Sequence, residues 1–288
     1  MKRDKLTPAD LYRIARGVSY PRLNQKTIDL VEAGAARPSR PVDSLELDAR
    51  YTAREQPAYY VDSPPLGIEY QPDVYRVAAA VAEELGSGTI IDIGAGSGEK
   101  LARLSDRFDL VGLDYGMNFD LSRKRYPAIH WREHDLEEDS PLPIEPGELA
   151  GATFVCADVI EHLVDPQPLL RKLRVALDEA AAIVLSTPDR TLLSATGHSG
   201  PPSNPCHVRE WSQCELARLL WNAGFQHGRV LHTRSHSWTF ARRTSLAVVV
   251  ARSCADALPR LTLIARFPRL SAVARWWRFG PTAGRPTP

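Results

Sequence analysis

One short stretch, residues 89–100, constrains the fold of this chain more than any other. Its sequence, TIIDIGAGSGEK, joins an apolar β-branched run to Asp92 and to glycines at alternate positions, Gly94, Gly96 and Gly98. The apolar run predicts a buried parallel strand, and the glycines allow a sharp turn that a ligand can approach without meeting a Cβ atom. A helix beginning just after the turn would point free backbone N–H groups at that ligand. The stretch therefore predicts a nucleotide-type site at the carboxyl end of a sheet.

The spacing of the glycines distinguishes this turn from two other nucleotide-binding turns. Dinucleotide-binding folds carry G-x-G-x-x-G, whereas the order here is D-x-G-x-G-x-G. A P-loop is excluded because no Lys-Ser or Lys-Thr pair follows the glycines. The next predicted strand, residues 109–113, ends in Asp114, whose carboxylate can accept hydrogen bonds from both hydroxyls of a ribose. An NAD-linked dehydrogenase stays open as a less favoured alternative, since it would share the strand, the turn and the helix.

A second motif, ADVIEHLVDP at residues 157–166, follows another predicted buried strand. Together with the glycine turn and Asp114, it resembles the class I S-adenosylmethionine (SAM)-dependent methyltransferases. Within that class it resembles the ubiquinone- and menaquinone-biosynthesis-type small-molecule methyltransferases. The resemblance covers residues 66–251 and implies SAM as the cofactor. The alternation of strands and helices predicts an α/β fold with a parallel sheet. The family implies a Rossmann-like, seven-stranded, mostly parallel sheet with helices on both faces.

The resemblance also implies which residues bind the cofactor. They belong to the glycine turn and to the ends of the neighbouring strands: Asp92, Gly94, Gly96, Gly98, Asp114, Asp135, Leu136 and Ala157. In the family an acid after the third strand holds the adenine amino group, and the following backbone N–H meets a ring nitrogen. Asp135 fits this role, with Glu137, or a merely solvated acidic run, as the alternative.

His162, inside the second motif, is the candidate catalytic residue. An imidazole titrates near neutral pH and can remove a proton from a substrate hydroxyl. A structural histidine that orients the loop is the equally weighted alternative. The neighbouring Asp158 and Glu161 suggest a divalent cation, as acids at this point bind one in some relatives. Two carboxylates are few ligands for such a cation, so a divalent cation is possible but unsupported, and no metal ligand is assigned.

A long loop, residues 187–211, supplies the candidate substrate-binding residues His198, His207 and Arg209. Loops at the carboxyl ends of parallel strands are where substrates bind. Its segment GHSGPPSNPCHVREW resembles uncharacterised bacterial methyltransferases, some associated with glycan or secondary-metabolite pathways. Tyr70 joins this group, because in the family the segment before the first core helix folds over the cofactor; anchoring a loop to the core is the alternative. A zinc site at the nearby cysteines is disfavoured, since the spacing matches no ordinary zinc pattern.

The 288 residues suffice for one sizeable domain with extensions. Residues 1–60 are polar and interrupted by prolines, which predicts an irregular N-terminal extension. The methyltransferase domain is placed at residues 61–254, with the last strand at 246–251. Residues 255–288 form a basic, Trp- and Arg-rich tail, in which one amphipathic helix could lie on an anionic membrane or pack onto the domain.

Composition limits the partners and the compartment. A net charge of +1 argues against a nucleic-acid-binding surface. Four cysteines without C-x-x-C pairs predict reduced thiols and a cytoplasmic location. The basic tail suggests that the protein could also bind peripherally to the inner face of the membrane. The chain is thus expected to transfer a methyl group from SAM to an oxygen of a small-molecule or glycan acceptor in bacterial biosynthesis. A non-catalytic protein of the same fold, docking through its tail, is the alternative.

Overall fold

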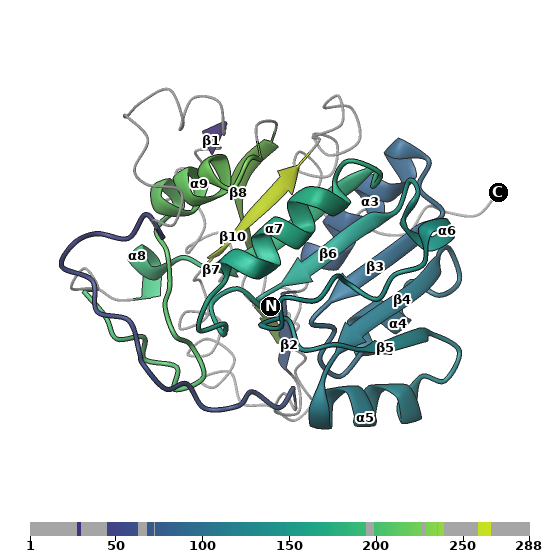
Figure 1. Cartoon of the computed structure of the whole chain (residues 1–288), viewed down its shortest axis with the longest axis horizontal. Helices are drawn as coiled ribbons and strands as arrows, with labels where there is room; N and C mark the ends of the chain where they lie inside the picture. Colours follow the sequence, from purple (N-terminus) through teal and green to yellow (C-terminus); the bar gives the residue numbers. More distant parts are fainter. Residues whose placement is uncertain are drawn as a thin grey trace, which may run out of the picture.

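The computed structural model describes residues 28–29, 45–62, 68–71, 73–193, 199–225, 228–234, 236–238 and 259–265. A twisted sheet runs through the centre of the molecule, with helices on both of its faces (Figure 1). Among the described residues, none of the helices combines the length and the apolar composition needed to cross a bilayer.

Five parallel strands form the half of the sheet that carries the two sequence motifs. They are β3 (Thr89–Ile93), β4 (Asp109–Asp114), β5 (His130–Glu133), β6 (Thr153–Ala157) and β7 (Ala182–Pro188). β3 pairs with β4 on one side and β6 on the other, so that the two motif-bearing strands are neighbours. The central strands β3, β6 and β7 read as almost continuous apolar runs because both faces of the sheet are covered. The predicted α/β fold with a parallel sheet is confirmed.

Antiparallel strands complete the sheet beside β7. They are β10 (Pro259–Ala265), β8 (Gly228–Arg234) and the short β1 (Ile28–Asp29), and the order across the sheet is β1-β8-β10-β7-β6-β3-β4-β5. The described part of the chain therefore has eight strands in this sheet and not the expected seven, because β1 joins the edge. A separate two-stranded sheet pairs β2 (Ile68–Tyr70) with β9 (His236–Trp238).

The last described strand lies beyond residue 254, the predicted end of the methyltransferase domain. The strand expected at residues 246–251 lies outside the described residues, whereas β10 at Pro259–Ala265 hydrogen-bonds along its full length to β7 and β8. The sheet therefore continues into the segment assigned to the basic tail. Hydrophobic periodicity within the segment could not identify this strand. What defines the strand is its hydrogen bonding to β7 and β8, which are other segments of the chain. The amphipathic helix expected in the basic tail lies outside the described residues.

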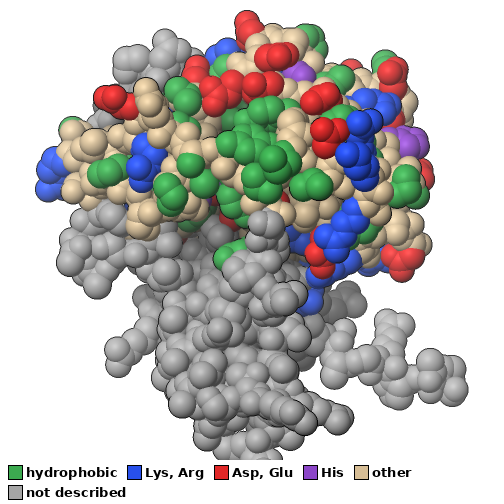
Figure 2. Space-filling view, turned by 90° about the horizontal axis from the view of Figure 1, so that it is seen from below, with side chains coloured by type: hydrophobic (Ala, Val, Ile, Leu, Met, Phe, Trp, Pro, Cys, Tyr) green, Lys and Arg blue, Asp and Glu red, His purple; other side chains and the backbone are tan. Residues whose placement is uncertain are grey.

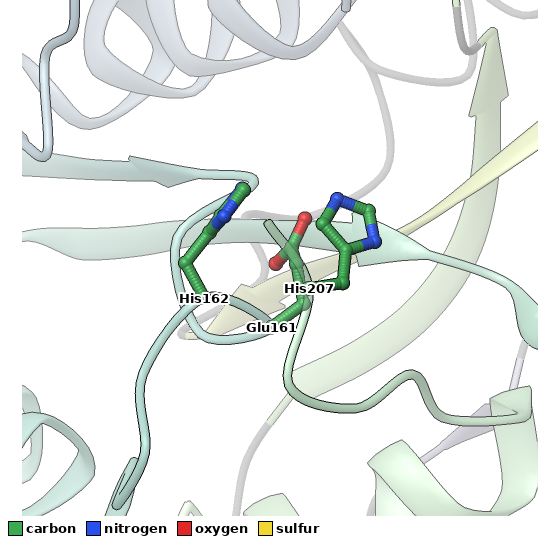
Figure 3. A group of neighbouring side chains, drawn as sticks. All are labelled: Glu161, His162 and His207. Carbon is green, nitrogen blue, oxygen red and sulfur yellow. The ribbon is translucent and has the colours of Figure 1, made fainter. Parts of the chain in front are cut away.

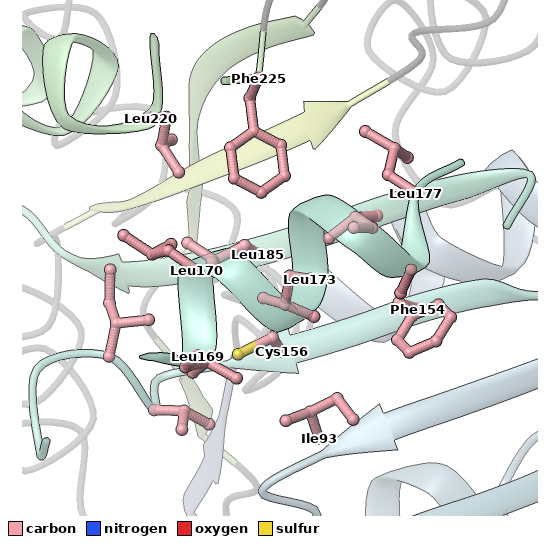
Figure 4. Close-up of a cluster of buried hydrophobic side chains, with 14 of the residues drawn as sticks. Ile93, Phe154, Cys156, Leu169, Leu170, Leu173, Leu177, Leu185, Leu220 and Phe225 are labelled. Carbon is pink, nitrogen blue, oxygen red and sulfur yellow. The ribbon is translucent and has the colours of Figure 1, made fainter. Parts of the chain in front are cut away.

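Two apolar cores hold the helices against the sheet. On one face, α7 (Gln167–Ala176) and α9 (Gln213–Asn222) pack their leucines against Ile93, Phe154 and Leu185 (Figure 4). On the other face, α3 (Val74–Leu85) and α4 (Glu99–Ala102) cover the alternate side chains of the same strands. A Leu-to-Ala change in such a core costs about 2–5 kcal/mol. These cores fix the strand ends at which the cavity opens.

The remaining helices are short or solvent-facing. They are α5 (Gly116–Arg125), α6 (Pro146–Leu149) and α8 (Arg190–Leu193). The helix α9 begins with a capping box: the Ser212 side chain accepts from the Glu215 N–H, and the Glu215 carboxylate accepts from the Ser212 N–H.

Residues 45–62, which we call the strap, have no helix or strand but lie along the loop 199–211. Backbone N–H groups of the strap donate to carbonyls of the loop: Thr52 to Ser199, Arg54 to Val208 and Ala58 to Pro205, at 2.7–3.0 Å. The Trp211 indole N–H donates back to the Leu45 carbonyl at 3.0 Å. Two segments more than a hundred residues apart thus form one layer over the carboxyl ends of β6 and β7.

Candidate functional site

A cavity of about 410 Å³ opens at the carboxyl ends of β3, β4 and β6. Its wall includes the glycine turn after β3, the end of β4 with the start of α5, the acidic segment after β5, the loop after β6, the segment around residues 70–75, and the strap together with the loop 199–211. A volume in this range suits a small-molecule or cofactor site. The cavity therefore lies where the sequence predicted a nucleotide-type ligand.

The glycine turn brings bare backbone to the cavity wall. Gly94 and Gly96 line the cavity and have φ angles of 72° and 57°, which a residue with a Cβ rarely adopts. A Cβ on Gly94 would lie 2.6 Å from Val159 Cγ2, and one on Gly96 would lie 2.7 Å from Asp62 Oδ2. Gly98 does not line the cavity; it begins α4 and packs against Trp131. The first two glycines shape the site, and the third serves the packing behind it.

Asp114 stands at the end of β4, facing the same turn. Its Oδ2 accepts the Gly96 N–H at 2.7 Å and its Oδ1 accepts the Tyr115 N–H at 2.8 Å. Burial raises the pKa of Asp114 to about 6, while these two N–H donors act in the opposite direction. The carboxylate is thus fixed at the cavity wall with further lone pairs available to a hydroxylated ligand.

Asp92 is buried behind the turn and does not line the cavity. The Tyr75 hydroxyl donates to its Oδ2 at 2.8 Å, and its Oδ1 has no hydrogen-bond partner among the described residues. Burial raises the pKa of Asp92 to about 7, against the lowering effect of the Tyr75 hydrogen bond and of Lys100. An orphaned buried oxygen at this point is costly, which marks the position as one that a ligand or a water relieves.

The acidic segment after β5 forms the next part of the wall. Asp135, Leu136 and Glu137 all line the cavity, so the structure brings both candidate acids to it. Asp135 Oδ1 accepts the Glu137 N–H at 3.0 Å in a local turn, and Glu137 Oε1 accepts the Val164 N–H at 2.7 Å. Glu137 therefore connects this wall to the loop after β6, whereas the Asp135 carboxylate accepts a hydrogen bond within its own turn.

The loop after β6 places Ala157, Asp158 and His162 on the cavity wall. Asp158 has a positive φ of 56°, an uncommon conformation for a non-glycine residue, and its Oδ1 accepts the Ser186 hydroxyl at 3.0 Å. His162 Nδ1 lies 2.9 Å from the Cys206 carbonyl oxygen. A carbonyl can only accept, so Nδ1 carries the proton and Nε2 carries the lone pair of the neutral ring.

The substrate-binding candidates separate in the structure. His207 and Tyr70 line the cavity. Arg209 does not, because its guanidinium donates to the Leu163 and Val164 carbonyls at 3.1 and 2.7 Å and so fixes the loop after β6. His198 lies outside the described residues.

The strap contributes site residues that the sequence analysis missed. Tyr59, Tyr60 and Asp62 line the cavity, and the Tyr60 ring lies 5.1 Å from the His162 ring. Asp62 Oδ2 accepts the Ser97 N–H of the glycine turn at 2.9 Å. The segment before the first core helix is rich in Tyr and Pro, but the family resemblance indicates Tyr70 and not the pair at 59 and 60.

One face beside the cavity carries exposed apolar side chains. Figure 2 shows hydrophobic side chains gathered in the middle of the face seen from below, bordered by acidic ones. The face includes α5, on or next to which Tyr115, Met117 and Leu121 are exposed, and Tyr115 also lines the cavity. Apolar surface therefore continues from the cavity wall onto α5.

Comparison with known proteins gives a match over the part of the chain that builds this cavity. A family model described as a methyltransferase domain matches residues 69–228. A probable S-adenosylmethionine-dependent methyltransferase of Mycolicibacterium smegmatis is 32% identical over 141 residues, which are 48% of this chain and 51% of that protein. One of the same description from Mycobacterium tuberculosis is 35% identical over 103 residues, 36% of this chain and 35% of that protein. The chain thus spans about half or less of the length of these relatives.

Solved structures give weaker matches. A SAM-dependent methyltransferase from Mesorhizobium loti has a TM-score of 0.49 and 17% identity, covering 68% of this chain and 99% of that one. The N-terminal domain of EvdMO1 with SAH bound has a TM-score of 0.42 and 21% identity, covering 68% and 80%.

Proposed function

The chain belongs to the methyltransferase-domain family, and from this premise we propose that it transfers the methyl group of SAM to a hydroxyl oxygen of a small-molecule or glycan acceptor. The observation that carries the proposal is the shared cavity, whose wall includes the glycine turn, Asp114 and His162. A cofactor half and an acceptor half then meet in one cavity, as a direct transfer requires.

The cofactor half fits SAM in its chemistry. Asp114 would accept hydrogen bonds from the ribose hydroxyls, and Asp135 with Leu136 would hold the adenine. Gly94 and Gly96 leave the approach that a side chain would close. The orphaned Oδ1 of Asp92 lies behind the same turn, where the polar methionine end of the cofactor would bring donors near it.

When bound, SAM would supply a sulfonium methyl carbon open to in-line displacement: the acceptor oxygen would bond to that carbon as the carbon–sulfur bond breaks and leaves its electron pair on sulfur. The acceptor's proton passes to Nε2 of His162, the nitrogen that the Cys206 carbonyl leaves unprotonated. The protein otherwise aligns the reactants and excludes water, which the strap and the loop 199–211 do by covering the strand ends.

The charge of the cavity wall favours an uncharged acceptor. Among the described lining residues, Asp62, Asp114, Asp135, Glu137 and Asp158 are acidic, and Lys100 alone is a lysine or arginine. An anionic acceptor, a nucleic acid included, would be repelled. Polyhydroxylated or aromatic alcohols would meet carboxylate acceptors and the Tyr59 and Tyr60 rings instead.

Calorimetric titration tests the cofactor half. SAM and its demethylated product should bind and NAD should not, and Asp114→Ala should weaken SAM binding by about 1.5–3 kcal/mol because a hydrogen bond to a charged group is lost. Asp106→Ala, an exposed carboxylate near the end of the helical segment after the turn, is the control and should bind SAM normally. Unchanged affinity in the Asp114 variant would remove that residue from the site. SAM binding without methyl transfer to any hydroxyl acceptor would favour the non-catalytic alternative.

We also propose that the basic C-terminal segment supports contact with an anionic membrane, as its Arg and Trp content suggests. Since β10 is part of the sheet, the truncation should remove only residues 266–288. The full chain should co-sediment with anionic vesicles and be released by salt, and the truncated one should not. Equal sedimentation of both proteins would exclude this segment as the anchor.

A further inference from the structure

Three potential metal ligands converge at the acceptor end of the cavity. Glu161 and His162 follow β6, and His207 comes from the loop 199–211. One ligand atom from each lies within 4.8 Å of the others. Figure 3 shows the Glu161 carboxylate between the two imidazole rings, which stand perpendicular with centroids 4.8 Å apart.

Each of these three side chains makes a hydrogen bond with an oxygen atom of another residue, and this bond fixes its orientation. His162 Nδ1–H donates to the Cys206 carbonyl, and His207 Nδ1 lies 2.6 Å from Glu210 Oε1, a carboxylate oxygen that accepts its proton. Glu161 Oε2 accepts the Thr187 hydroxyl at 2.9 Å. Imidazoles whose Nδ1–H is bound to a carbonyl or carboxylate present a more basic Nε2 in a fixed direction, and this is the arrangement that metal-ligating histidines show.

From this geometry we infer a divalent transition-metal site formed by Glu161 Oε1, His162 Nε2 and His207 Nε2. Two imidazole nitrogens and one carboxylate oxygen suit Zn²⁺, Co²⁺ or Mn²⁺ better than Mg²⁺ or Ca²⁺, which prefer sets of oxygen ligands. Three protein ligands leave coordination positions for another oxygen. From the sequence, only Asp158 and Glu161 were candidate ligands for a divalent cation; the fold brings His162 and His207 close to Glu161.

The site needs one local adjustment. Asn204 Nδ2 lies 2.8 Å from His207 Nε2 and donates to it, while Asn204 Oδ1 accepts the Cys206 N–H. A cation at Nε2 replaces that amide donor. The carboxylate of Glu161 is buried, so a bound dication also neutralises a charge that is expensive to bury.

The role of the cation, though not the site, rests on the proposed function. The acceptor's oxygen would occupy an open coordination position, where the cation stabilises the deprotonated oxygen and the proton passes to water in the cavity. His162 is then a ligand, so its part as proton acceptor applies to the cation-free protein. Removal of the cation with a chelator distinguishes the role of His162 as a metal ligand from its role as a proton acceptor.

The test is a Co²⁺ titration of the chelator-treated full chain, followed by calorimetry and by visible absorption. We expect one Co²⁺ per chain with the spectrum of nitrogen and oxygen ligands. Glu161→Gln and His207→Ala should each weaken binding at least about tenfold. His130→Ala, which removes an exposed imidazole bonded to Glu148, should leave it unchanged. Asn204→Ala should bind Co²⁺ at least as tightly as the wild type.

Several results would overturn the site: no saturable binding, thiolate charge-transfer bands, or equal binding by the Glu161 and His207 variants. Thermal denaturation of each variant shows whether it folds, and Glu161→Gln keeps an acceptor for Thr187. SAM binding and methyl transfer are measured on the same samples. A protein that transfers methyl groups but binds no Co²⁺ retains the proposed function and loses this inference. One that binds Co²⁺ through these residues but not SAM retains the site and loses the function.

Discussion

The two halves of the cavity are built in opposite ways. The cofactor half comes from consecutive strand ends, with Gly94, Gly96 and Asp114 within one strand–turn–helix–strand unit. The acceptor half joins the strap to the loop 199–211 through long-range hydrogen bonds and adds the loop after β6. Local chemistry determines the first half, whereas the second exists only when the whole domain is folded. Changes in the two halves should therefore be separable in experiment.

The largest expected effect lies in the acceptor half. His162→Ala should lower turnover by about 10²–10⁴-fold, whether the imidazole takes a proton or holds a cation, because either role acts on the acceptor oxygen. SAM affinity should hardly change, since Asp114 and the glycine turn are untouched.

Single-turnover rates and SAM calorimetry on the same His162 preparation make this comparison. Loss of SAM binding in parallel with turnover would mean that the two halves are not independent. Unchanged turnover per folded molecule, with a lower melting temperature, would assign His162 a structural role.

The next effect belongs to the cofactor half and depends on pH. The folded-state pKa of Asp92 is about 7 and its ordinary value is 3.8, so the folded state binds the proton more tightly than the unfolded state. Stability should be unaffected by this group below pH 3.8 and should fall as pH rises toward 7, by up to about 4 kcal/mol. Asp92→Asn removes the titration but keeps an acceptor for Tyr75.

Melting temperatures of the wild type and of Asp92→Asn from pH 5 to pH 8 test this expectation without cofactor. The variant's advantage should grow with pH, and SAM should reduce it if donors near the turn pair with the carboxylate. A constant difference between the two proteins across this range would show that Asp92 is not protonated in the folded state.

The smallest effect concerns the contact between strap and loop. Arg54 donates to the Pro202 and His207 carbonyls at 2.6 and 3.2 Å, so Arg54→Ala should cost about 0.5–1.5 kcal/mol of stability for each bond and raise the KM of the acceptor. The Kd of SAM should stay the same. Arg50→Ala is the matched control, because that guanidinium is exposed and pairs only locally with Asp48. Equal effects of both variants would indicate a general charge effect.

The contrast between the halves also explains what the sequence could predict. The strands β3, β4, β6 and β7 follow from their apolar runs, and Asp114 follows from its place after one of them. Asp62 and Tyr60 could not be found this way, since they reach the cavity only because the strap crosses from the loop 199–211 to the glycine turn. Arg209 has the side-chain chemistry of a ligand-binding residue, but its guanidinium donates to the carbonyls of Leu163 and Val164. Long-range pairing, on which both cases depend, leaves no local pattern.

The place of β10 in the sheet has a consequence for how the chain is made. A ribosome produces β7 and β8 well before Pro259–Ala265, the strand that hydrogen-bonds to both of them. Until that strand emerges, the nascent chain exposes an open edge on β7, and such an edge recruits other strands. The polypeptide can complete the parallel half of its sheet during translation, but it must wait for its last described strand to close the other.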